Sequence, residues 1–171
     1  MKPEIDFINN FVLNSDQLFR HLCHKADWDR RLKRRKTASY GVAYNYSGMT
    51  YPKTEMLEDL IAICEKIDRH VGFMPNNCLL NYYPDGNSTM GYHSDNWKEL
   101  ETGTGVVIVS LGASRTIAYR SKKDAAIEYK YLLNGGDLLY MNNNVQQGLM
   151  HSIPQEIQLE GRISMTFRKI R

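Results

Sequence analysis

A histidine and an aspartate stand one residue apart in GYHSDNW, the segment of residues 91–97. In an extended strand, residues i and i+2 point to the same face, so His93 and Asp95 would project together and Ser94 would point away. The imidazole and the carboxylate would lie about 6–7 Å apart, a separation at which both can bind one metal ion. Polar pairs at this spacing are common on strand surfaces, so the hypothesis needs a third ligand.

His151, in the segment MHSIP, is the candidate third ligand because it follows the apolar run DLLYMN, which is expected to form a strand. Two histidines and one carboxylate on one face of a metal leave three positions open, as in the facial triad of non-haem Fe(II) oxygenases. The same donors could hold Zn²⁺, although zinc sites usually close tetrahedrally with a single open position. His24 and His70 lie in charged helical segments and are given no role.

The C-terminal segment GRISMTFRKI would add two cations to such a site. If this segment is a strand, one of its faces is polar and the other is apolar. The polar face comprises Arg162, Ser164, Thr166 and Arg168, and the apolar face comprises Ile163, Met165 and Phe167. Arginines that point into a protein core are unfavourable unless an anion meets them, and a guanidinium matches a carboxylate with two parallel hydrogen bonds. A dicarboxylate co-substrate beside the metal would explain both arginines.

The chain that must position these residues has a helical part followed by a strand-rich part. Apolar residues at helical spacing predict helices over residues 15–25 and 53–72, the second ending at Gly72. From residue 77 onward, about eight short runs predict strands, separated by turn segments such as PDGN, TGTG, NGGD and NNNV. This order predicts an α+β fold in which the helices pack on a β-sandwich or barrel.

Length and composition favour one soluble domain over residues 1–171. The three cysteines are irregularly spaced, which argues against a disulfide framework and favours reduced thiols. We find neither a secretory signal pattern nor a run of membrane-spanning length, so we expect a cytoplasmic protein without a membrane partner. We also expect a monomer.

Positive charge is concentrated in RRLKRRK, residues 30–36, which we call the basic segment. It holds six of the 22 lysines and arginines, and the rest of the chain has 16 basic against 19 acidic residues. The six are Arg30, Arg31, Lys33, Arg34, Arg35 and Lys36. Such a cluster suits a nucleic-acid backbone, although many charge runs are simply solvated loops.

Five motifs together resemble the AlkB family of Fe(II)/2-oxoglutarate dioxygenases, from about residue 34 to 170. The chain has NYYPDG, GYHSD, VSLGASR, HSIP and RISMTFR in the order in which the family has N-x-Y, H-x-D, S-L-G, H-S-x-P and R-x-x-x-T-F-R. The upstream RKTASYGVAYNYSG resembles the segment that leads to the substrate lid, most closely in members that act on double-stranded DNA. The resemblance implies a double-stranded β-helix, or jelly roll, over residues 77–171. Residues 1–76 would form a helical N-terminal part and the lid.

The resemblance also implies roles for individual residues. His93, Asp95 and His151 would bind Fe(II), with O₂ as the oxidant. The residues expected to contact 2-oxoglutarate are Asn81, Tyr83, Arg162, Ser164 and Arg168, with Arg162 on the distal carboxylate. The residues expected to contact the substrate are Tyr44, Tyr46, Asn96, Trp97 and the six cationic residues of the basic segment, with Tyr46 stacking on a flipped base.

The activity that the resemblance implies is oxidative demethylation of alkylated bases in nucleic acid, in DNA rather than RNA. The hydroxylated methyl group would leave as formaldehyde, and the target base would be flipped out of the duplex. Trp97 stands where the family commonly has an acid that reads the damaged base, and this leaves open the same chemistry on RNA, a protein side chain or a small molecule. A non-catalytic nucleic-acid-binding module is a further alternative, which the triad and both arginines disfavour.

Overall fold

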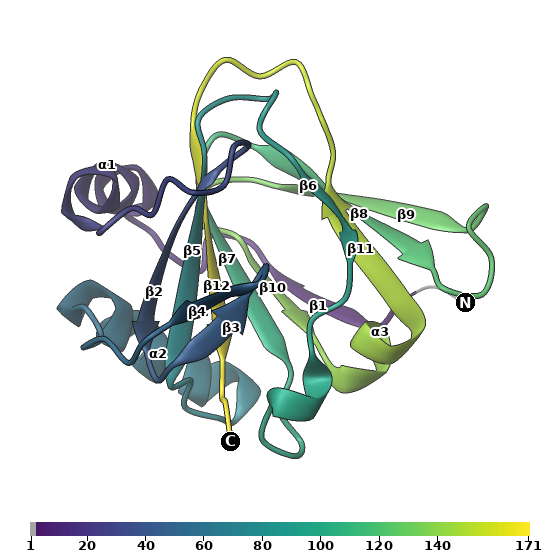
Figure 1. The fold of residues 1–171 in the computed structure, drawn as a ribbon, viewed down its shortest axis with the longest axis horizontal. Coiled ribbons are helices and arrows are strands. Elements are labelled where there is room, and N and C mark those ends of the chain that lie inside the picture. Colours follow the sequence, from purple (N-terminus) through teal and green to yellow (C-terminus); the bar gives the residue numbers. More distant parts are fainter. Residues whose placement is uncertain (1–2) are drawn as a thin grey trace.

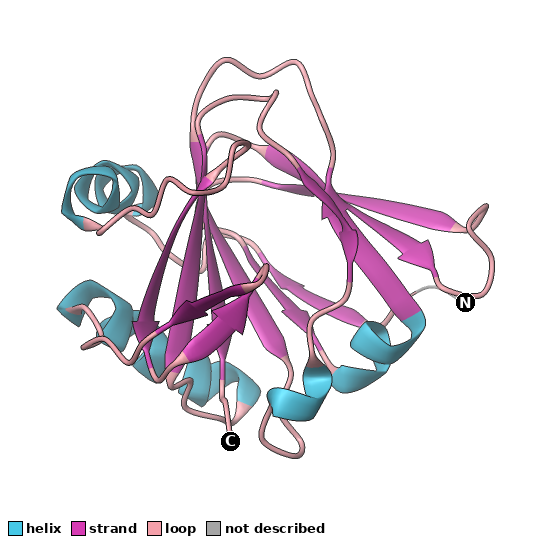
Figure 2. Ribbon diagram, in the orientation of Figure 1, coloured by secondary structure: helices cyan, strands magenta, loops and turns pink. Residues whose placement is uncertain are grey.

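Two antiparallel sheets face each other in the computed structural model of the protein, which describes residues 3–171 (Figures 1 and 2). The larger sheet has the order β1 (Ile5–Ile8), β10 (Leu138–Met141), β7 (Val106–Gly112), β12 (Arg162–Arg168), β5 (Asn77–Tyr83) and β2 (Lys36–Gly41). The smaller sheet has the order β6 (Met90–His93), β11 (Leu149–Ile153), β8 (Arg115–Ser121) and β9 (Glu128–Leu133). This arrangement confirms the jelly-roll core.

Successive side chains along a strand point to opposite faces of the sheet, and apolar side chains form a layer on each face of the larger sheet. The outer layer lies between this sheet and the helices α1 (Ser15–Lys25) and α2 (Glu58–Val71), and Met165 and Phe167 of β12 belong to it. The inner layer lies between the two sheets and includes Tyr83, Ile108 and Tyr119. The polar face of β12 therefore points inward, between the sheets, as its sequence predicts.

All eight strands predicted after residue 77 are present, from β5 to β12. The first helix has the predicted bounds, whereas α2 begins at Glu58 rather than at residue 53. Thr54 exchanges two backbone hydrogen bonds with Gly41, and these hold residues just before α2 in an extended conformation. Gly72 ends α2 as predicted, with the left-handed backbone (φ 83°) that glycine adopts at little cost.

Two local predictions were wrong. Residues 1–76 are not simply helical, because β1 and β2 join the larger sheet at its two edges and β3 (Tyr44–Tyr46) pairs with β4 (Met49–Tyr51) in a hairpin. We call residues 44–51 the lid hairpin. The segment NNNV is not only a turn, because Asn142 caps the short helix α3 (Asn143–Gly148) by accepting a hydrogen bond from the Val145 amide.

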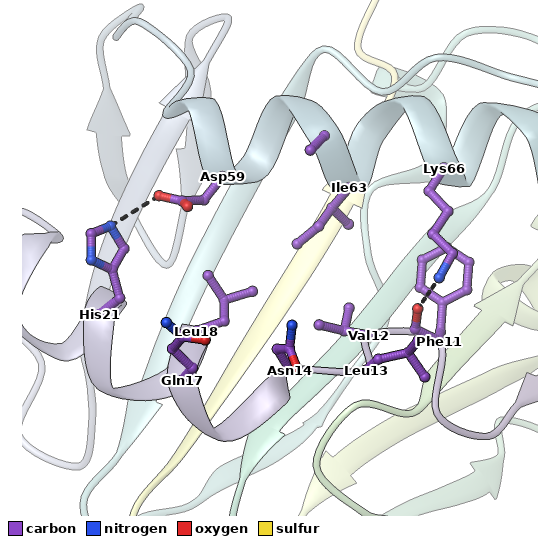
Figure 3. A pocket seen from close by; sticks show the side chains of 11 residues that line it. Phe11, Val12, Leu13, Asn14, Gln17, Leu18, His21, Asp59, Ile63 and Lys66 are labelled. Carbon is purple, nitrogen blue, oxygen red and sulfur yellow. Dashed lines mark hydrogen bonds and ion pairs between the residues drawn. The ribbon is translucent and has the colours of Figure 1, made fainter.

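A hollow of about 680 Å³ lies between α1 and α2 on the outer side of the molecule (Figure 3). His21 of α1 and Asp59 of α2 face each other across it at 3.0 Å, and Lys66 donates to the Phe11 carbonyl. These contacts join the two helices and do not resemble a catalytic constellation. Among residues 3–171, we find no helix that is both long and apolar enough to span a membrane.

Candidate metal and co-substrate site

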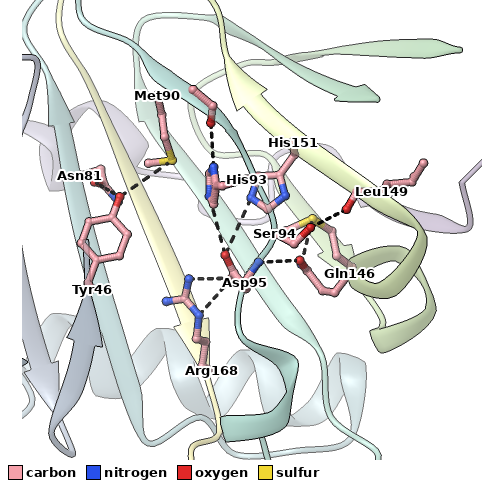
Figure 4. Close-up of polar contacts among 12 residues, drawn as sticks. Tyr46, Asn81, Met90, His93, Ser94, Asp95, Gln146, Leu149, His151 and Arg168 are labelled. Carbon is pink, nitrogen blue, oxygen red and sulfur yellow. Dashed lines mark hydrogen bonds and ion pairs between the residues drawn. The ribbon is translucent and has the colours of Figure 1, made fainter. Parts of the chain in front are cut away.

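The three predicted metal ligands meet between the sheets (Figure 4). His93 ends β6, Asp95 follows two residues later, and His151 lies opposite His93 in the neighbouring strand β11. One ligand atom from each residue lies within 4.8 Å of the other two. Asp95 Oδ1 is 3.8 Å from Nε2 of His93 and 3.9 Å from Nε2 of His151. The same-face geometry inferred from the sequence is therefore present.

Neighbouring groups orient two of these side chains. His93 Nδ1 lies 2.8 Å from the Gly91 carbonyl, so Nδ1 carries the proton there and Nε2 presents its lone pair toward Asp95 and His151. Arg168 donates from Nε and Nη2 to Asp95 Oδ2, at 3.1 and 2.7 Å, which leaves Oδ1 facing the histidines.

The protonation states also suit metal binding. Burial opposes the charge of Asp95, but Arg168, followed by His151 and His93, outweighs it and lowers the pKa of the carboxyl to about 2. Burial lowers the pKa of His151 to about 4, so its imidazole is neutral near pH 7. A carboxylate and a neutral imidazole are the forms that bind metals.

Two side chains connect the His-x-Asp segment to the segment that carries His151. The buried Gln146 of α3 accepts a hydrogen bond from the Asp95 amide through Oε1, at 3.0 Å. Ser94 points away from the ligands, as predicted, and its hydroxyl donates to the Leu149 carbonyl at 2.8 Å. Both bonds fix the separation of the two neighbouring chain segments that supply the ligands.

Arg162 provides the second feature of the site. Its side chain is fully buried, and Nε donates to the Ser110 hydroxyl at 2.7 Å, while Nη1 and Nη2 make no hydrogen bond. Burial lowers the pKa of its guanidinium to about 10, so it stays a cation near pH 7. A buried cation with two free donors is unfavourable unless an anion binds them.

A narrow cavity joins Arg162 to the triad. It is lined by Asn81 and Tyr83 of β5, by Ser164 and the rest of the polar face of β12, and by Tyr46 of the lid hairpin. Its free volume is only about 30 Å³, roughly the share of one water molecule in liquid. In this conformation the cavity is smaller than a dicarboxylate.

Arg35 binds two residues that line the cavity, Tyr46 and Asn81, and is not free for a nucleic-acid backbone as predicted. Its guanidinium donates to the Tyr46 hydroxyl at 2.6 Å, to Asn81 Oδ1 at 3.0 Å and to the Thr89 carbonyl at 3.3 Å. The Tyr46 hydroxyl also donates to Asn81 Oδ1, at 3.2 Å (Figure 4). The lid and a predicted co-substrate residue thus share one hydrogen-bond network.

Three other predicted substrate residues do not line the cavity. Asn96 is exposed, and its side chain caps the 3₁₀ helix η1 (Trp97–Glu99) by accepting from the Lys98 amide. Trp97 packs on the inner apolar layer because η1 turns it toward that layer. Tyr44 is buried under Arg168, whose guanidinium carbon lies 4.7 Å from the ring centroid.

The basic segment is divided rather than uniform. Arg31 pairs with Asp29, Lys36 lies over the Tyr82 ring, and Arg35 donates to the Tyr46 hydroxyl. The side chains that stay exposed without an ion pair are Arg30, Lys33 and Arg34. Sequence reasoning also missed the roles of Ser110 and Gln146. Ser110 lies in the VSLG motif, which was a usable signal, whereas nothing in NNNVQQG indicated a buried glutamine.

Comparison with protein families identifies the superfamily of the chain. The family model described as the 2OG-Fe(II) oxygenase superfamily matches residues 12–168. The chain belongs to the 2OG-Fe(II) oxygenase superfamily. Within this superfamily, the similarity to AlkB homologues confirms the AlkB resemblance. The matched range contains the triad, Arg162 and the lid hairpin.

Two curated relatives illustrate this membership. A rat protein named alpha-ketoglutarate-dependent dioxygenase alkB homolog 3 is 29% identical over 176 residues, which cover 91% of this chain and 60% of the rat protein. A bovine protein named DNA oxidative demethylase ALKBH2 is 33% identical over 147 residues, which cover 80% of this chain and 53% of the bovine protein. The chain thus spans little more than half the length of these relatives.

A solved structure has the same fold. The structure of OsALKBH1 superposes on this oxygenase with a TM-score of 0.76 over 99% of both chains, at 17% sequence identity. The jelly-roll architecture predicted from the motifs is confirmed by this similarity.

Proposed function

We propose that this protein is an Fe(II)/2-oxoglutarate-dependent dioxygenase that demethylates alkylated bases in nucleic acid. The observation that carries the proposal is that one cavity holds both a His-Asp-His group and a buried guanidinium with two unpaired donors. Neither feature alone would support the proposal. Clusters of histidines and acids occur without a metal, and buried arginines occur in protein cores. Together they match the two ends of a metal-chelating dicarboxylate.

The donor set fits Fe(II) and 2-oxoglutarate. His93, Asp95 and His151 would bind the metal on one face and leave three positions open. With Fe(II) held by these residues, the site would activate O₂ while 2-oxoglutarate is converted to succinate and CO₂, and a C–H bond of the substrate would be hydroxylated.

The chain's own residues bind and orient the reactants. Arg162 would hold the distal carboxylate of 2-oxoglutarate through its two free Nη groups, with Asn81, Tyr83 and Ser164 along the same cavity. Arg168 keeps Asp95 ionised and turned so that Oδ1 faces the histidines. Tyr46 would cover the cavity and exclude water from it.

Nucleic acid is the proposed substrate, and DNA in preference to RNA. Tyr46 presents an aromatic ring at the cavity on which a base can stack. The basic segment contacts the same lid through Arg31 and Arg35, and it carries three further cationic side chains that are exposed. The bovine relative's name describes a DNA oxidative demethylase. Trp97 was the reason to consider another target, and because it packs on the apolar layer, it no longer supports one.

We further propose that the protein works as a single domain, as a monomer in the cytoplasm. The three cysteines, Cys23, Cys64 and Cys78, are free, in keeping with a reducing compartment.

A substrate panel tests the proposal. The protein is incubated with Fe(II), 2-oxoglutarate and O₂, together with single- and double-stranded DNA and RNA oligonucleotides that each carry one N-methylated base. Mass spectrometry should show loss of the methyl group from at least one DNA oligonucleotide. Turnover of 2-oxoglutarate without demethylation of any oligonucleotide would exclude nucleic acid as the substrate.

A further inference from the structure

The loop of residues 154–161, which leads into β12, exposes two large apolar side chains. Ile157 is fully exposed and Leu159 is 91% exposed. The loop forms the yellow arch at the top of Figure 1, above the sheets. Single exposed apolar residues are common on protein surfaces, but two on one short loop form a small patch that a partner can cover.

Arg115 makes the base of this loop rigid. Its side chain is fully buried, and its guanidinium donates to three carbonyls of two loops, those of Asp85 (3.1 Å), Ser88 (2.8 Å) and Pro154 (2.9 Å). Its Nε lies 3.5 Å from a carboxylate oxygen of Glu156. Arg115 has no part in the proposed chemistry, so these contacts are the role that the structure gives it.

The backbones of the two loops are also joined. The Gly86 amide donates to the Gln158 carbonyl at 2.7 Å, and the Gly86 carbonyl accepts from the Glu156 amide at 3.1 Å. A Cβ at residue 86 would lie 1.9 Å from the Glu156 carbonyl oxygen, so only glycine permits this approach. Ile157 and Leu159 are therefore held outward on a fixed support.

The same support contacts the basic segment from its other side. Arg34 donates to the Thr89 hydroxyl at 3.4 Å, and Arg35 donates to the Thr89 carbonyl at 3.3 Å. The loop of residues 84–89 thus lies between the apolar pair and the basic segment, and the three loops gather at one end of the molecule (Figure 1). Of the acids in these loops, Glu156 is paired with Arg115 and Asp85 accepts a hydrogen bond from the Asn87 amide, so Glu160 is the exposed acid beside the apolar pair.

We infer that Ile157 and Leu159 contact the bases of double-stranded nucleic acid, while the exposed cationic side chains of the basic segment contact its phosphates. Apolar side chains of this kind insert between base steps and unstack them, and phosphate contacts position the protein beside them. The inference rests on the proposed function and extends it, because unstacking a duplex helps a base to reach the cavity. The adjoining positive charge favours nucleic acid over a second protein as the partner.

The test compares duplex with single strand in one variant. The double variant Ile157→Ser/Leu159→Ser is assayed on a methylated oligonucleotide, alone and annealed to its complement. Demethylation of the duplex should fall by about tenfold or more, since base contacts of this type contribute strongly to unstacking, while the single strand is used within about twofold of wild type. The matched control is Leu13→Ser, which removes another exposed apolar side chain, two residues before the start of α1.

A second readout does not depend on turnover. A duplex with 2-aminopurine beside the methylated base should brighten on binding the wild-type protein under anaerobic conditions, and this rise should be lost in the double variant. Equal brightening by both proteins would overturn the inference, and so would equal loss of activity on duplex and single strand. A wild-type dimer in light scattering that the double variant abolishes would assign the patch to a second copy instead. If the wild type brightens the duplex but demethylates nothing, the proposed function fails while the inference stands.

Discussion

The two arginines of β12 share one strand face but differ in their partners. Arg168 forms a buried pair with Asp95, whereas the Nη groups of Arg162 have no partner. The sequence predicted that both side chains point inward, because strand alternation depends on local order alone. It could not predict the pairing with Asp95, since 73 residues separate the two and only the folded sheets bring them together.

Replacing Arg162 by methionine should affect the stability of the protein and its binding of 2-oxoglutarate in different ways. The variant removes a buried, unpaired charge, so its free energy of unfolding without co-substrate should be unchanged or higher by about 1–4 kcal/mol. Binding of 2-oxoglutarate should weaken by about 2–5 kcal/mol, because its distal carboxylate loses the guanidinium. Thermal unfolding with Mn²⁺, with and without 2-oxoglutarate, measures both. Equal protection of variant and wild type by 2-oxoglutarate would place the co-substrate elsewhere.

At the scale of elements, the strands after residue 77 were predicted well and those before it were not. The eight strands from β5 to β12 have clear apolar runs bounded by turn residues, so local pattern was sufficient. β1 and β2 were missed because their short, mixed sequences IDFI and KTASYG become strands only by pairing with β10 and β5. The role of Gln146 was missed for the same reason, because it depends on α3 packing beside the His-x-Asp segment.

Gln146→Ala should weaken metal binding without unfolding the protein. The change leaves the Asp95 amide without its acceptor and loosens the segment that carries two ligands, and such orienting contacts are typically worth 10- to 100-fold in metal affinity. Titration with Co²⁺, followed by its absorption bands, measures the dissociation constant. Gln147→Ala, at the exposed neighbouring position, is the control and should match wild type. Identical Co²⁺ affinities in all three proteins would show that Gln146 does not orient the ligands.

The lid hairpin should act on the nucleic-acid substrate rather than on the co-substrate reaction. Tyr46→Ala removes the ring proposed to stack on a base, so use of methylated oligonucleotides should fall by about one to two orders of magnitude. Succinate formation without oligonucleotide should persist. Tyr46→Phe keeps the ring and loses only the hydroxyl contacts to Arg35 and Asn81, so it should resemble wild type far more closely. Steady-state kinetics with both variants would show whether the ring or the hydroxyl matters.

At the scale of the whole molecule, the basic segment contacts the lid hairpin through Arg31 and Arg35. Only part of the segment is free to bind phosphate. Composition alone could count six cationic residues and could not tell that Arg31, Arg35 and Lys36 have partners within the protein. The pairings of Arg35 and Lys36 depend on tertiary contacts with Tyr46 and Tyr82, whereas Arg31 pairs with Asp29 only two residues earlier in the sequence.

Neutralising Arg30, Lys33 and Arg34 together should weaken binding to all oligonucleotide sequences alike. Loss of three phosphate contacts should reduce the slope of log K against log salt for duplex DNA by about 2–3. Fluorescence anisotropy over a range of salt concentrations measures this slope. A triple variant at Lys25, Lys53 and Lys123, which are exposed elsewhere, removes the same charge and should keep a slope closer to that of wild type. Equal slopes in both triple variants would show that the basic segment affects binding only through the net charge of the protein.

The most direct test of the central claim is a single turnover. The protein is loaded anaerobically with one equivalent each of Fe(II) and 2-oxoglutarate, mixed with an excess of methylated DNA oligonucleotide, and exposed to O₂. If one cavity holds the metal, the co-substrate and the flipped base, succinate and formaldehyde should form in equal amounts, approaching one of each per protein. His151→Ala should form neither. Absence of succinate from the loaded wild-type protein, or equal succinate from His151→Ala, would contradict the assignment of this cavity.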